Sequence, residues 1–154
     1  MKKAIILLLL ALVMITGCSV HDEISAREDE VAIGVDISEI SEDIYRLDMN
    51  YYLDGELMGG LAVSAVNQKP LRKEPYAFYL DRNSFPEDVD LSRFSFDIRV
   101  QGDDTTLNEM FSESEHAANT GKSEIFAVEY GKVYNYIITG SFEEGFKLEK
   151  TAHE

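Results

Sequence analysis

The side chains that most often carry out catalysis are scarce in this sequence. It has one cysteine, Cys18, and three histidines, of which His21 and His153 lie near the chain ends and His116 lies inside. A serine nucleophile would need His116 as its base, and no G-x-S-x-G element presents a serine to it. Zinc needs three or four closely spaced ligands, and no such cluster containing histidine or cysteine occurs. We therefore expect no enzyme activity and no cofactor.

Carboxylates are abundant, with 29 Asp and Glu residues in the chain. Glycoside hydrolysis needs two of them at a suitable separation, and among so many acids some pair always meets that condition. An envelope hydrolase that uses carboxylates is therefore the alternative function. Calcium is a second use of such oxygens, for which Glu87, Asp88, Asp90, Asp103 and Asp104 are candidates. They do not match the calcium loop of an EF-hand, so we interpret them as solvated turn residues and predict no metal site.

Four tyrosines, Tyr52, Tyr79, Tyr134 and Tyr136, lie in segments that alternate like β-strands. Alternation would leave some of them on an outward sheet face, where tyrosine offers a large contact area at low cost in conformational entropy. They are the candidate binding face for a protein, peptide or glycan, with ordinary packing within strands as the alternative. The chain has no tryptophan, which argues against glycan stacking in particular.

The N-terminal segment indicates the compartment. Lys2 and Lys3 precede an uninterrupted apolar run from Ala4 to Ile15, and small residues follow it. These are the parts of a secretory signal peptide. The run of 12 residues is shorter than the roughly 20 that cross a bilayer as a helix, so we do not expect a transmembrane anchor.

The sequence Ile15-Thr16-Gly17-Cys18 resembles the lipobox of bacterial lipoproteins, and the resemblance covers residues 1–18 only. It implies that a diacylglyceryl group is attached to the sulfur of Cys18 and that the signal peptide, residues 1–17, is cut off before it. Two acyl chains are enough to hold a protein stably at a bilayer. We therefore expect a lipid-anchored protein on the extracytoplasmic side of the cell membrane, with an unidentified envelope or extracellular partner.

The remaining chain divides simply. Residues 18–30 are polar and charged, which predicts a lipidated N-terminus and a tether, while 31–150 suffice for a single domain and 151–154 form a tail. No thiol besides Cys18 is left for a disulfide. Removing Lys2 and Lys3 leaves 12 basic residues against 29 acidic ones, a formal charge of −17. Such a surface repels nucleic acid, so we expect no nucleic-acid partner.

Alternation of apolar and polar residues predicts a series of short strands. Two of them, over 45–53 and 56–66, flank Asp54-Gly55, which is typical of a two-residue hairpin turn. Gly59 and Gly60 predict a bulge or a close backbone approach in the second strand. The strand over 94–101 is expected to have one face in the core and the other in water. Further strands are predicted over 76–80, 125–130, 132–139 and 142–148, with 125–130 and 132–139 forming a second hairpin about Gly131.

One short helix is also expected. Thr106 and Glu109 match a capping box, apolar residues follow at helical spacing, and Asn119-Thr120-Gly121 offers a stop. Many short strands with one helical insert favour a mainly β fold. We predict an antiparallel β-sandwich of immunoglobulin-like architecture, with a small β-barrel as the alternative.

Overall fold

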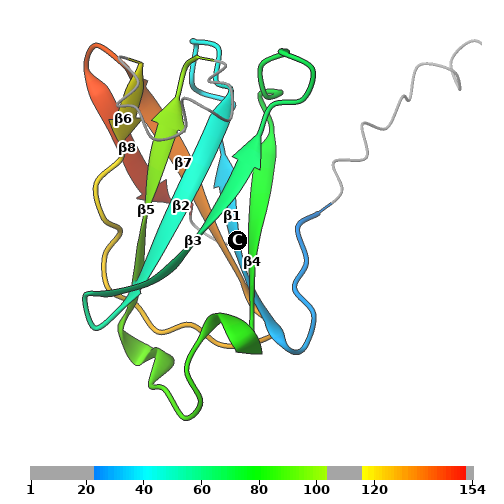
Figure 1. The fold of residues 1–154 in the computed structure, drawn as a ribbon, viewed down its shortest axis with the longest axis vertical. Coiled ribbons are helices and arrows are strands. Elements are labelled where there is room, and N and C mark those ends of the chain that lie inside the picture. Colours follow the sequence, from blue (N-terminus) through cyan, green and yellow to red (C-terminus); the bar gives the residue numbers. More distant parts are fainter. Residues whose placement is uncertain (1–22, 104–115, 152–154) are drawn as a thin grey trace, which may run out of the picture.

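The computed structural model describes residues 23–103 and 116–151 as two four-stranded sheets packed face to face (Figure 1). This confirms the predicted β-sandwich, and the described strands do not close into the alternative barrel. One sheet has the order β4-β1-β7-β8 and the other β3-β2-β5-β6. The strands are β1 (Glu30–Asp36), β2 (Arg46–Leu53), β3 (Glu56–Ser64), β4 (Pro75–Asp81), β5 (Phe94–Gln101), β6 (Ala117–Asn119), β7 (Val133–Ser141) and β8 (Gly145–Lys150).

The hairpin of β2 and β3 forms as predicted. Asp54 and Gly55 both have positive φ, 49° and 85°, which is the backbone that a type I′ turn requires. Tyr51 lies opposite Gly59 whereas Tyr52 lies opposite Leu57, so one residue of β3 bulges out of the ladder between them. The bulge predicted from Gly59 and Gly60 is thereby confirmed, directly beside Gly59.

The first sheet is not wholly antiparallel. β1 pairs antiparallel with β4 on one side but parallel with β7 on the other. β7 then pairs antiparallel with β8, so both of its edges are occupied. The predicted hairpin of 125–130 with 132–139 is therefore wrong, because the neighbours of β7 come from β1 and β8.

Residues 120–126 take an irregular course along β5, and the strand predicted over 125–130 does not form. The amide of Ser123 donates to the carbonyl oxygen of Phe96 at 2.7 Å, and Phe94 and Phe126 exchange two backbone hydrogen bonds. The Ser123 hydroxyl also accepts from the amide of Phe96 at 3.1 Å. Within 125–130, Phe126 forms an isolated bridge to Phe94, and the amide of Glu129 donates to the hydroxyl of Tyr134, so no regular ladder forms there.

The predicted helix from Thr106 onward lies largely outside the described residues. Its predicted end at Asn119-Thr120-Gly121 is wrong, because Ala117–Asn119 form β6 and pair antiparallel with β5. The described residues contain two short 3-10 helices, η1 (Arg82–Ser84) and η2 (Leu91–Arg93), both between β4 and β5. No helix within that part of the chain is long and apolar enough to cross a bilayer.

The core lies between the two sheets and is rich in aromatic rings. Phe94 and Phe96 of β5 are fully buried, with Phe96 edge-on to Tyr136 at 4.8 Å between ring centroids. The opposite face of β5 is not in water as predicted, since Ser95 and Asp97 are each only 4 % exposed. Alternation therefore separates the two faces of β5 correctly, but it does not predict that the polar residues of the outer face are buried.

Candidate functional site

The four candidate tyrosines do not form one face. Tyr52 lies on the outer face of its sheet, and Tyr79 on the outer face of the other sheet, opposite Ala32 in the register and 45 % exposed. Tyr134 and Tyr136 are paired with core residues of β1 and point between the sheets. Tyr136 contributes little to any outward face, since it lies beside Val35, packs against Phe96 and is only 5 % exposed. Cys18 lies outside the described residues.

Tyr52 belongs to a polar network centred on Asp97. Its hydroxyl donates to Asp97 Oδ2 at 2.7 Å, while the side-chain amides of Asn50 and Asn119 donate to Asp97 Oδ1 at 3.1 and 3.0 Å. The ammonium of Lys122 lies 3.7 Å from the centroid of the Tyr52 ring. The bond to Asp97 and, after it, burial raise the pKa of Tyr52 to about 12. These contacts satisfy the buried carboxylate without a direct ion pair, which identifies the network as structural.

The connection between β4 and β5 is held in shape by its own side chains. Asp81 caps η1 by accepting from the amides of Asn83 and Ser84, and these bonds lower the pKa of its carboxyl. Asp90 caps η2 in the same way through the amide and hydroxyl of Ser92. Two Asx caps within one connection therefore fix a backbone that has little regular structure.

An aromatic anchor joins this connection to the core. Phe85 is 6 % exposed and lies edge-on to Tyr51 at 5.7 Å and to Tyr130 at 6.5 Å between centroids. The hydroxyl of Tyr51 donates to the carbonyl oxygen of Ser84 at 2.9 Å. The connection is consequently a rigid scaffold for the residues that flank Phe85.

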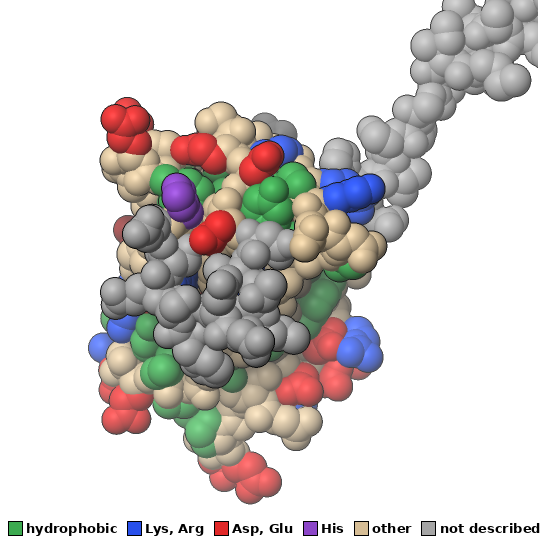
Figure 2. All heavy atoms as spheres, turned by 45° about the horizontal axis from the view of Figure 1, so that its top comes forward, with side chains coloured by type: hydrophobic (Ala, Val, Ile, Leu, Met, Phe, Trp, Pro, Cys, Tyr) green, Lys and Arg blue, Asp and Glu red, His purple; other side chains and the backbone are tan. Residues whose placement is uncertain are grey.

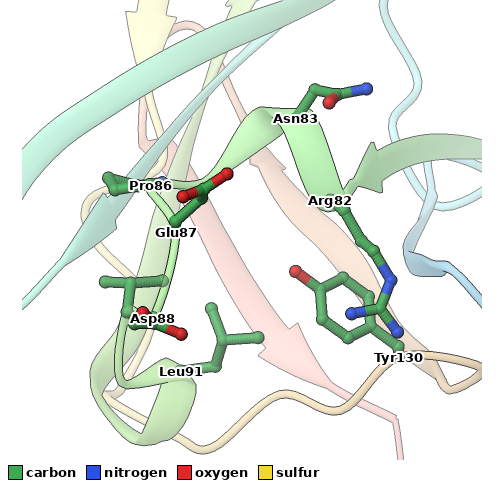
Figure 3. A pocket seen from close by; sticks show the side chains of 8 residues that line it. Arg82, Asn83, Pro86, Glu87, Asp88, Leu91 and Tyr130 are labelled. Atoms are coloured by element: carbon green, nitrogen blue, oxygen red, sulfur yellow. The ribbon is translucent and has the colours of Figure 1, made fainter.

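The residues on either side of Phe85, together with Tyr130, line a solvent-open cavity of about 490 Å³ (Figure 3). We call it the 82–91 cavity. The guanidinium of Arg82 lies over the Tyr130 ring, 4.6 Å from its centroid. Glu87 and Asp88 lie on the wall across from this pair in Figure 3. The full lining is Arg82, Asn83, Pro86, Glu87, Asp88, Val89, Leu91 and Tyr130. The volume falls in the range of small-molecule sites.

The charges of the 82–91 cavity are separated. No carboxylate of the described residues forms an ion pair or hydrogen bond with the Arg82 side chain, which is exposed. Asp88 adopts a left-handed backbone with φ of 57°, a conformation that aspartate tolerates better than most residues. The cavity therefore presents a stacked cation on one side and two carboxylates on the other.

Metal binding has no comparable arrangement. Across residues 23–103 and 116–151, no group of three or more His, Cys, Asp or Glu side chains is placed to hold an ion. Acidic side chains are spread among basic ones over the face seen in Figure 2 instead of gathering in one patch.

Comparison of this chain with protein-family models, curated proteins and solved structures finds no match. The candidate site thus stands on its geometry. Of these lining residues, Glu87 and Asp88 are candidates from sequence alone, whereas Arg82 and Tyr130 are not, because they lie far apart in the chain. Asp81 followed by Asn83 and Ser84 is a local capping signal that could have located the turn, whereas nothing local links it to Tyr130.

Proposed function

We propose that this chain is a lipid-anchored binding protein of the extracytoplasmic membrane face, and that its 82–91 cavity takes a small zwitterionic ligand such as a short peptide. The observation that carries the ligand class is the Arg82 guanidinium stacked on Tyr130, free of ion pairs with described carboxylates and facing Glu87 and Asp88. The role is binding and not catalysis.

Each wall of the cavity has a chemical task in this proposal. Arg82 binds the ligand carboxylate, for which its planar fork of donors is suited, and stacking on Tyr130 restricts the guanidinium before the ligand arrives. Glu87 or Asp88 accepts from the ligand ammonium. Val89 and Leu91 offer apolar surface to a small side chain. Restricting the cation in advance reduces the entropy lost on binding.

The membrane part of the proposal rests on the lipobox resemblance at Ile15-Thr16-Gly17-Cys18. A lipid on Cys18 leaves residues 18–22 before the described chain begins at Glu23, a span of at most about 18 Å when fully extended. The proposed anchor therefore keeps the domain close to the bilayer surface.

The ligand proposal is tested by NMR titration of the chain from Cys18 to Glu154 with the dipeptide Ala-Ala. We expect chemical-shift changes at residues 82–91 and Tyr130, and much weaker changes with N-acetyl-Ala-Ala-amide, which lacks both charges. Arg82→Gln removes the cation and should weaken binding by about tenfold or more. The matched control is Arg93→Gln, because Arg93 pairs with Asp54 outside this cavity. Equal shifts for the dipeptide in wild type and Arg82→Gln would disprove the assignment.

The anchor proposal is tested separately with the full precursor in a bacterial host. We expect the mature N-terminal peptide to begin at a lipid-modified Cys18 and the protein to partition into detergent. Cys18→Ala should abolish both the modification and the partitioning. An unmodified wild-type product would refute the anchor and leave the cavity proposal untouched.

A further inference from the structure

A second cavity, of about 350 Å³, opens between β8 and the irregular segment 123–126. It is lined by Phe126 and Leu148 as apolar surface, by Tyr136, and by the charged residues Glu124, Glu149 and Lys150. None of these residues belongs to the 82–91 cavity. We call it the β8 cleft, and it is independent of the proposed function above.

Tyr136 is the feature that points to a ligand. Its side chain is only 5 % exposed, yet its hydroxyl has no hydrogen-bond partner in the described part of the chain. The other tyrosine hydroxyls that are turned inward have one: Tyr51 donates to Ser84, and Tyr134 accepts from the amide of Glu129 at 3.0 Å. A hydroxyl without a protein partner is left to bond to water or to a ligand.

The hydroxyl of Tyr136 also retains access to solvent. Within the residues that the structure describes, no side-chain nitrogen or oxygen is both fully enclosed and unpaired, so this oxygen must be partly accessible. Tyr136 lines the β8 cleft, and the cleft is therefore the space that its hydroxyl can reach.

Packing does not account for the hydroxyl. The Tyr136 ring lies 4.8 Å from the Phe96 ring and 6.0 Å from the Phe126 ring, between centroids. A phenylalanine ring would make the same contacts, so they do not explain why the residue carries a hydroxyl. The oxygen is thus available to donate to an acceptor inside the cleft.

The charges around the cleft favour an uncharged acceptor. Glu124 lies close enough to Tyr136 to add to the effect of burial, which raises the pKa of the Tyr136 hydroxyl to about 12. Glu124 and Glu149 oppose an anion, and the Lys150 ammonium is drawn over the Phe126 ring at 5.5 Å from its centroid. A neutral carbonyl oxygen accepts from a tyrosine hydroxyl without meeting this repulsion.

The position of the cleft suits an extended chain. β8 is the edge strand of its sheet and has a strand neighbour only on the β7 side among the described strands. Extended peptides are commonly bound at such edges, with side chains in adjoining pockets. Phe126 and Leu148 supply an apolar pocket beside this edge.

We propose that the β8 cleft binds an apolar residue within a peptide chain, whose backbone carbonyl accepts a hydrogen bond from the hydroxyl of Tyr136. The apolar side chain lies against Phe126 and Leu148. The peptide bond on either side supplies the neutral acceptor that the surrounding carboxylates tolerate. The ligand differs from that of the 82–91 cavity, since it carries no charge at the point of recognition.

The probe is N-acetyl-phenylalaninamide, titrated into the chain from Cys18 to Glu154 and followed by NMR. We expect shifts at residues 123–126 and 148–150, and weaker binding of N-acetyl-phenylalanine, whose carboxylate faces Glu124 and Glu149. Tyr136→Phe should weaken binding by about three- to tenfold. The same variant should leave the unfolding midpoint unchanged or raise it, because it keeps the ring contacts and removes a hydroxyl that has no partner among the described residues.

Tyr134→Phe is the matched control on the same strand. Its hydroxyl accepts from the Glu129 amide, so its loss should lower the unfolding midpoint and leave binding of the probe unchanged. The proposal is overturned if the probe produces no shifts at the cleft, if Tyr136→Phe binds as tightly as wild type, or if the free carboxylate binds more tightly than the amide. Failure of Ala-Ala to bind would bear only on the 82–91 cavity.

Discussion

The tyrosines of this protein differ in what their hydroxyl groups contact. The hydroxyl of Tyr52 bonds to the buried carboxylate of Asp97, and that of Tyr136 has no partner among the described residues. Both have a pKa raised to about 12, chiefly by the bond to Asp97 for Tyr52 and chiefly by burial for Tyr136. The same titration behaviour therefore has two causes, and substitution separates them.

We predict that the free energy of unfolding falls between about pH 10 and pH 12. In the unfolded chain a tyrosine ionises near pH 10. In the folded chain Tyr52 and Tyr136 stay neutral until about pH 12, so their contribution is fully present below pH 10 and is lost as the pH rises through the folded pKa. Denaturant unfolding at several alkaline pH values measures this loss.

Absorbance of tyrosinate identifies the residues responsible. Tyr52→Phe and Tyr136→Phe should each remove one late-titrating group from the curve of the folded protein. Tyr52→Phe should also cost about 1 kcal/mol at neutral pH, since it breaks a hydrogen bond to a charged acceptor at a partly exposed site. Titration of all tyrosines together near pH 10 would contradict the prediction.

Asp97 illustrates how far residue patterns could be used for prediction. Its alternation with Phe96 and Ile98 correctly places it on the outer face of β5. Its burial, however, depends on partners such as Asn119, which lie after a long stretch of intervening chain. Periodicity within one strand contains no information about such partners. The face that carries Asp97 was therefore expected to be exposed to water, although Asp97 is buried in a hydrogen-bond network.

At the scale of elements, the two hairpins of the sandwich depend on glycine in different ways. Gly55 needs a positive φ of 85° at the tip of the β2–β3 turn, where a Cβ would meet no atom within 4 Å. Gly140 has φ of 103° within β7, and a Cβ there would overlap the carbonyl oxygen of Gly145 in β8. Gly55 is required only for its backbone conformation, whereas Gly140 is also required because no Cβ atom fits between it and Gly145.

Alanine substitutions at these two glycines should therefore differ in cost. Gly55→Ala should lower the free energy of unfolding by about 1 kcal/mol, the usual strain of a left-handed backbone. Gly140→Ala should lower it by about 3 kcal/mol or more, because the obstacle is backbone of the paired strand and cannot rotate away. Equilibrium unfolding in urea measures both, and equal losses would show that the close approach is unimportant.

The elements that were predicted well are those that local sequence determines. Asp54-Gly55 contains the whole signal for its hairpin, and β4 and β5 follow from alternation. The parallel pairing of β1 with β7 joins segments about a hundred residues apart and has no local signal. The 82–91 cavity was missed for the same reason, since Tyr130 reaches Arg82 only because β1 lies between β4 and β7 in one sheet.

At the scale of the whole molecule, the N-terminal segment before β1 is not a free tether over its whole length. The side chain of Ile24 lies against Gly34, on the outer face of β1, where the Asn135 side chain also packs. The amide of Glu30 donates to the carbonyl oxygen of Arg27, and the amide of Gly131 donates to that of Glu30. Residues 24–29 thus form part of the folded domain beside β1.

This contact predicts that Ile24 stabilises the domain locally. Ile24→Ala should lower the free energy of unfolding by about 1 kcal/mol, less than a fully buried isoleucine would because its side chain is only half-buried. Ser25→Ala is the matched control, since Ser25 is exposed and its replacement should change little.

Hydrogen exchange distinguishes local from global effects of Ile24→Ala. The amide of Glu30 should exchange faster than the global loss of stability explains, because detachment of the segment opens its bond to Arg27 without unfolding the sheets. β2 and β5 pair with each other in the sheet that does not contain β1. The exchange rates of their amides should rise only as much as the global loss of stability explains. Uniform acceleration throughout would mean that the segment and both sheets unfold as one unit. With the lipid proposed at Cys18, this contact sets the free length of the anchor, because each residue that detaches adds up to about 3.5 Å of reach from the bilayer.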